Sequence, residues 1–113
     1  MTKKVTRMTR GRTGRIRWLR LKKIAESIAG CPVAIHGSTE LPVSLRAAVD
    51  AEAGQGVDIA LNFQYIKDAD EALEAVAHEL AHVVARTGEH DNKFEEAREE
   101  ILERLKQDYY RSG

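Results

Sequence analysis

The stretch Ala77–Ala85, AHELAHVVA, constrains this chain more than any other, because its residue spacing acquires a meaning only on a helix. His78 and His82 are four residues apart, so a helix would place their imidazoles on one face, with ring nitrogens able to converge on one ion. Glu79 would point to the side of that pair and could take a proton from a metal-bound water without filling a coordination position. This pattern is typical of zinc-dependent hydrolysis, which needs nitrogen ligands, an open position and a separate base.

The surroundings of the motif decide its meaning, because His-Glu-x-x-His also arises by chance in many helices. Asp68 is placed as an N-cap and Glu71 as the partner in a capping box, and an amphipathic helix follows them. Gly88 is positioned beyond the end of that helix. His90 is a third candidate ligand, and three of the four histidines fall within residues 77–91. The sequence therefore predicts a metal site.

Length and composition limit the possible architectures. A chain of 113 residues forms one domain, and its 5% aromatic content requires a core built mainly from Leu, Ile, Val and Ala. The single cysteine, Cys31, excludes an internal disulfide and a Cys-based zinc site, which favours a reducing compartment. No apolar run approaches the length of a membrane span, and no hydrophobic segment follows the basic N-terminus. We expect a cytoplasmic protein that does not enter a membrane.

A net charge of zero conceals an uneven distribution. Residues 1–23 hold ten of the 18 cations and none of the 18 acids, so the remaining 90 residues carry a net charge of −10. Gly11 and Gly14 interrupt any helix there, and we expect a flexible basic arm at residues 1–14 before a single domain at 15–113. The arm could bind nucleic acid through phosphates, lie on the acidic remainder of its own chain, or remain a solvated tail.

Three helices are expected. An apolar i, i+3, i+4 stripe that includes Trp18 predicts the first at residues 16–29, with Gly30 placed to end it. The motif helix is the second. Asn92, together with Glu95, is placed to cap a last helix that runs to about residue 110.

About three strands are expected between the first two helices. Residues 31–35 read as a short strand. Residues 43–53 alternate between apolar and polar but would also suit a short helix, and we favour the strand. The reason is that Gly54-Gln55-Gly56 joins this segment directly to a second alternating run at 57–62, a hairpin signal. The expected fold class is therefore α+β: an N-terminal helix, a small mainly antiparallel sheet, the motif helix and a C-terminal helix.

The chain resembles the SprT-like family of zinc metallopeptidases over roughly residues 43–105. The resemblance lies in Ile59-Ala-Leu-Asn62, the following AHELAH, and the His-x-x-x-Phe pair of His90 and Phe94. It implies a zincin-like fold, a Zn²⁺ cofactor, the zinc ligands His78, His82 and His90, and Glu79 as catalytic base. The chain also resembles the minimal single-domain gluzincins, whose third ligand is a glutamate of the following helix. The candidates for that ligand are Glu95, Glu96, Glu99 and Glu100.

Three functions remain open from the sequence. The first is a zinc metalloendopeptidase whose extended peptide substrate pairs with the strand at 57–62. Tyr65, Tyr109 and Tyr110 are then candidates for a second group that stabilises the oxyanion. The second is a metal-dependent ribonuclease with a three-histidine site, although the residue after the first histidine of such enzymes is usually not Glu. The third is a latent or non-catalytic zinc-binding module.

Overall fold

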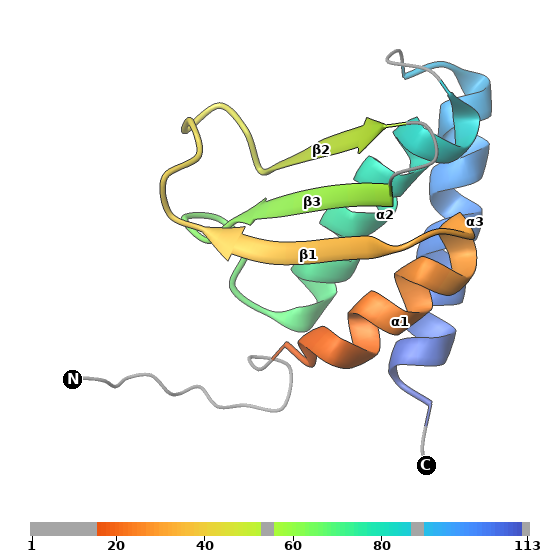
Figure 1. Ribbon diagram of the computed structural model, residues 1–113, viewed down its shortest axis with the longest axis horizontal. Helices are drawn as coiled ribbons and strands as arrows, with labels where there is room; N and C mark the ends of the chain where they lie inside the picture. Colours follow the sequence, from red (N-terminus) through yellow and green to blue (C-terminus); the bar gives the residue numbers. More distant parts are fainter. Residues whose placement is uncertain (1–15, 53–55, 87–89, 112–113) are drawn as a thin grey trace.

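The described part of the chain, residues 16–52, 56–86 and 90–111 of a computed structural model, contains three helices and one three-stranded sheet (Figure 1). This confirms the α+β fold class. The basic arm, the turn residues Gly54 and Gln55, and Gly88 lie outside the described residues. In chain order the elements are α1 (Trp18–Ala29), β1 (Val33–Ser38), β2 (Ala47–Glu52), β3 (Gly56–Asn62), α2 (Ala69–Ala85) and α3 (Asn92–Tyr109).

The strand order is β1-β3-β2, so β3 is the central strand. β2 and β3 pair antiparallel, with Val49 opposite Ile59, which confirms the predicted hairpin. β1 pairs with β3 in parallel, with Ile35 opposite Ile59. The sheet is therefore mixed rather than mainly antiparallel, because β1 joins the side of β3 that the hairpin leaves free.

α1 and α2 pack against one face of the sheet, with α2 behind it in Figure 1, and α3 packs against these two helices. Val57, Ile59 and Leu61 alternate along β3 and are buried on that face. Asp58 lies between them on the open face, where it contacts His36 at 3.0 Å. One covered face and one open face explain the period-two pattern from which the strands were predicted. No helix in the described part of the chain is long and apolar enough to cross a membrane.

Side-chain caps mark where α2 and α3 begin. The carboxylate of Asp68 accepts a hydrogen bond from the backbone N–H of Glu71 at 2.9 Å, as predicted for α2. The Glu71 carboxylate accepts from the N–H of Lys67 at 2.7 Å, one residue earlier than in a capping box. At α3 the N-cap is Asp91 and not Asn92: the Asp91 carboxylate accepts from the N–H of Phe94 at 2.9 Å.

Candidate metal centre

Two of the three predicted ligands lie on α2, one turn apart. Core packing holds this helix in place, since Leu73, Val76, Ala77 and Leu80 are fully buried. His78 and His82 lie on the side that is left partly exposed, and their ring centroids are 5.0 Å apart. The histidine pair is therefore positioned by burial of the opposite side of the helix.

His90 reaches the same place through the chain reversal between α2 and α3. α2 ends at Ala85, and its C-cap, Arg86, has a left-handed backbone (φ 56°, ψ 43°). The N–H of Arg86 donates to the carbonyls of His82 and Val83. Asp91 then begins α3 by capping it. His90 lies directly before that cap, and its Nε2 is 3.3 Å from the Nε2 of His82.

The three histidines lie close enough together to bind a metal ion. One ring nitrogen from each of His78, His82 and His90 lies within 4.8 Å of the other two. No other group of three or more His, Cys, Asp or Glu side chains in the described ranges is arranged in this way. The structure thus brings together two residues of α2 and one residue of the connection that precedes α3.

Phe94 forms the floor of the cluster. Its ring centroid lies 5.0, 4.6 and 4.7 Å from those of His78, His82 and His90, and only 1% of the residue is exposed. Because Phe94 is also part of the hydrophobic core, the core and the site share one side chain. The sequence already pointed to Phe94, and the residue that it missed is Asp91, whose cap fixes the start of α3 next to His90.

The electrostatics of the cluster favour an uncharged imidazole at His78. Partial burial lowers the pKa of His78, and the charges of His82 and His90 lower it further. A lowered pKa keeps the ring neutral, and a neutral ring nitrogen has the lone pair that a metal ion needs.

Glu79 lies beside the cluster with only 8% of the residue exposed. Burial raises the pKa of its carboxyl, and the nearby charge of His82 offsets part of that rise. Glu79 is thus a carboxyl whose proton affinity exceeds that of an ordinary glutamate, next to three converging nitrogens.

The other side chains considered from the sequence lie elsewhere. The glutamates of α3 named as alternative ligands, Glu95, Glu96, Glu99 and Glu100, are exposed, and Glu95 contacts Arg98 at 3.1 Å. The three tyrosine hydroxyls have partners away from the histidines: Tyr65 donates to the Val43 carbonyl, Tyr110 donates to Asp70, and Tyr109 accepts from the N–H of Arg17.

The sheet edge beside the cluster is β2 and not β3. The segment 57–62, which we expected to pair with an extended peptide, is the central strand and already has a partner on each side. β2 has β3 on one side only and runs beside α2, with Arg46, the residue before it, 3.9 Å from Glu71. Any added strand near the histidines must therefore pair with β2.

The model of the eCIS core domain family matches residues 32–90, a stretch that begins just before β1 and ends at His90. No curated protein and no solved structure matches the chain.

Proposed function

The chain belongs to the eCIS core domain family, and we propose that it is a zinc-dependent metallopeptidase in which His78, His82 and His90 hold the metal and Glu79 is the general base. The family description names no reaction, so the proposal rests on the site itself. One observation carries it: three histidine nitrogens lie within 4.8 Å of one another, beside a buried glutamate.

The donor set fits zinc. In a tetrahedral site with Zn–N bonds of about 2.0–2.1 Å, two ligand nitrogens are about 3.3–3.4 Å apart. The Nε2 atoms of His82 and His90 are 3.3 Å apart, which is long for a hydrogen bond. Three imidazoles and no sulfur suit a borderline metal ion and leave a fourth position for water.

The buried glutamate supplies the acid–base chemistry. Bound zinc would lower the pKa of a coordinated water toward ~7 and polarise the scissile carbonyl. Glu79 would accept the proton of the attacking water as the oxygen of that water bonds to the carbonyl carbon. When the C–N bond breaks, Glu79 would deliver that proton to the leaving nitrogen. Its raised pKa suits both steps, because the carboxylate must first accept a proton and then give it up.

An extended substrate would be positioned by the outer edge of β2. The N–H of Asn62 donates to the carbonyl of Arg46, so in the antiparallel pattern the next residue, Ala47, and then Val49 and Ala51 direct their backbone groups away from β3. A peptide that pairs there lies alongside α2, with few side-chain requirements. An edge strand beside the motif helix also agrees with the resemblance to SprT-like peptidases. The glutamate-ligand variant of the minimal gluzincins is less well supported, since the α3 glutamates are exposed.

Metal analysis and a peptide-library cleavage assay test the proposal. Glu79→Gln should bind zinc with the stoichiometry of the parent and lose cleavage by about 10²–10⁴-fold, the range typical of a general base. The matched control is Glu103→Gln, which alters an exposed glutamate of α3 and should cleave like the parent. Unchanged cleavage by Glu79→Gln contradicts the mechanism. If the parent binds zinc but cleaves no peptide, the chain is a non-catalytic zinc-binding module. If it cleaves RNA and no peptide, it is a ribonuclease.

A further inference from the structure

The exposed side of α2 has a row of acids that leads to the histidines. Asp70, Glu74, His78 and His82 follow one another at intervals of four residues, so they lie along one side of the helix, and Glu71 lies next to this row. We call Asp70, Glu71 and Glu74 the acidic row. α2 contains no Lys or Arg from Ala69 to Ala85.

The acids of α3 are balanced differently. That helix also contains Lys93, Arg98, Arg104 and Lys106, and two of these cations contact acids: Arg98 contacts Glu95 and Arg104 contacts Asp108. In the acidic row, Glu71 is 3.9 Å from Arg46, whereas no ion pair with another described residue is seen for Glu74. The negative charge of α2 is therefore the less compensated of the two.

The outer edge of β2 runs alongside this row. Its outward-directed backbone groups, those of Ala47, Val49 and Ala51, have no strand partner among the described residues. Such an edge readily takes up an extended segment. The surface between β2 and α2 therefore combines unpaired backbone groups with negative charge, which suits an extended and strongly basic segment.

The chain contains such a segment. Residues 1–15 carry six cations, no acid and no proline, whereas residues 16–113 carry a net charge of −6. The six cations are Lys3, Lys4, Arg7, Arg10, Arg12 and Arg15. Opposite net charges on two parts of one chain favour contact between them, most strongly at low salt.

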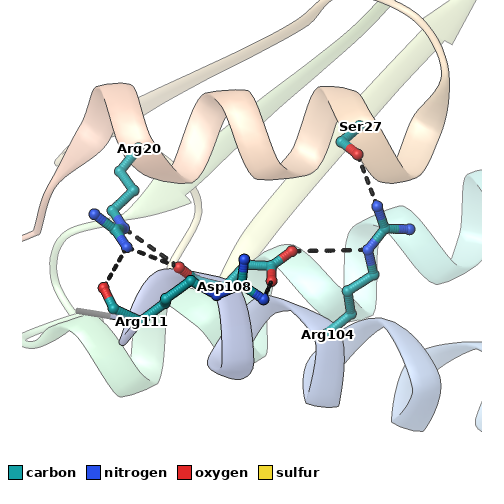
Figure 2. Close-up of polar contacts among 5 residues, drawn as sticks. All are labelled: Arg20, Ser27, Arg104, Asp108 and Arg111. Carbon is teal, nitrogen blue, oxygen red and sulfur yellow. Dashed lines mark hydrogen bonds and ion pairs between the residues drawn. The ribbon is translucent and has the colours of Figure 1, made fainter. Parts of the chain in front are cut away.

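The segment also joins the folded domain close to the acidic row. The N–H of Arg17 donates to the Tyr109 hydroxyl at 2.8 Å, and the hydroxyl of the next residue, Tyr110, donates to Asp70. Figure 2 shows the guanidinium of Arg20 bound to the carbonyls of Asp108 and Arg111, at 3.0 and 2.6 Å, which holds the first turn of α1 at this end of α3.

The distance is within reach. His78 lies eight residues beyond Asp70 along α2, about 12 Å at 1.5 Å per residue. Fifteen residues can span up to about 50 Å. The segment can therefore pass around the start of α2 and follow the acidic row to the histidines.

We propose that residues 1–15 dock on this surface in extended form, with their cations opposite the acidic row and their backbone along β2. The docking does not require catalysis. Its consequence, that the segment occupies the path of a peptide substrate and competes best with basic peptides, rests on the proposed function.

Paramagnetic labelling of the full-length chain tests the docking without any activity measurement. A spin label is attached at Thr6→Cys in a Cys31→Ser background. The intensities of the amide signals of the folded domain are then measured with the label paramagnetic and again after the label is reduced. At about 0.02 M salt we expect Val49, Glu74 and His78 to lose more than half of their intensity. At about 0.5 M salt, where the Debye length falls to about 4 Å, the signals should recover. Tenfold dilution should change nothing, because the contact is within one chain.

Charge reversal provides the matched pair. Glu74→Lys should reduce the intensity loss at least twofold, whereas Glu103→Lys, an exposed glutamate of α3 without an ion pair to a described residue, should leave it unchanged. If Glu74→Lys does not fold, as judged by its amide spectrum, the salt dependence of the parent decides. Broadening centred on another surface, equal effects of both variants, or loss on dilution overturns the proposal. The proposal is also overturned if the label broadens no signal of the folded domain and residues 1–15 respond only to an added oligonucleotide. That result would show that the segment binds nucleic acid.

Discussion

Glu79 is a residue whose place in the fold and whose place in the chemistry impose opposite demands. It lies on the helix that also buries Leu80 and Val76, with only 8% of its surface exposed, so the fold favours its neutral form. A general base must be ionised before it can accept a proton. The metal-free protein therefore contains a group whose charged state weakens the folded state.

This conflict predicts a pH dependence of stability. Because the folded pKa of Glu79 lies above the usual 4.5, the folded state binds more protons than the unfolded chain between those two values. The contribution of Glu79 to stability is therefore fully present below about pH 4.5 and is lost as the pH rises through the folded pKa. With chelator present, Glu79→Gln should melt increasingly above the parent as the pH is raised from about 4 to about 8. A constant difference between the two melting curves would contradict this.

A second prediction concerns the third ligand. His90→Ala should lose zinc on mild dialysis, since removal of one of three protein ligands weakens binding by orders of magnitude. Glu99→Ala should keep it, because Glu99 is exposed and no contact with the cluster is seen. Metal content by elemental analysis separates the two cases. The reverse pattern would move the site to the glutamate-ligand arrangement of the minimal gluzincins.

At this scale the sequence was informative where the spacing of residues is dictated by a helix. The four-residue interval of His78 and His82 determined their proximity before any tertiary contact was known. The cap of α3 was wrong by one residue because Asp91 and Asn92 are both good N-caps. In the structure the N-cap is Asp91, which accepts a hydrogen bond from the N–H of Phe94, and the side chain of Phe94 is buried in the core.

Among the elements, α2 ends in a way that a helix seldom does. Its C-cap, Arg86, is the one non-glycine residue with a positive φ in the described part of the chain. Glycine adopts this conformation without steric cost and is the usual residue there. The sequence suggested Gly88 instead, which lies outside the described residues.

Arg86→Gly should therefore stabilise the protein. Relief of the left-handed strain should outweigh the added freedom of the unfolded chain and raise the free energy of unfolding by about 0.5 kcal/mol. Urea unfolding of the metal-free protein measures the change. Glu103→Gly, which introduces glycine at an exposed interior position of α3, should lower stability instead by about 1 kcal/mol. Destabilisation by Arg86→Gly would show that its side chain has a role that the backbone geometry does not reveal.

The strands were predictable individually, but their order was not. Alternation of apolar and polar residues indicates a strand with one covered face, but it does not indicate which strand will be its neighbour. β1 lies beside β3 partly through a contact that no local pattern encodes: Gly37 leaves space for the ring of Phe63, which a Cβ at that position would approach to 2.0 Å. Phe63 in turn packs on Trp18, with ring centroids 5.8 Å apart. Contacts between residues distant in sequence thus help to place β1 beside β3.

At the scale of the whole molecule, α1 and α3 are joined by polar contacts at both ends of their interface (Figure 2). Arg20 binds two carbonyls at the C-terminal end of α3, and Arg104 donates to the Ser27 hydroxyl at 2.7 Å. Arg20→Gln should remove donors from carbonyls that the helix itself cannot satisfy and lower the free energy of unfolding by about 1 kcal/mol. Lys23→Gln changes an exposed cation on the same helix and should have little effect. Equal melting of the two variants would contradict the role given to Arg20.

Phe94 belongs both to the histidine cluster and to the core, and this has a consequence for the binding and release of a metal ion. Phe94, His78 and His82 are held by the core and by α2, so on the proposed function much of the binding site is already formed before zinc arrives. Zinc fingers gain their fold with the ion and release it only by unfolding. Here, on the proposed function, the ion could leave without unfolding the chain. An enzyme of this design would keep its fold when a chelator removes zinc and would regain activity when zinc returns.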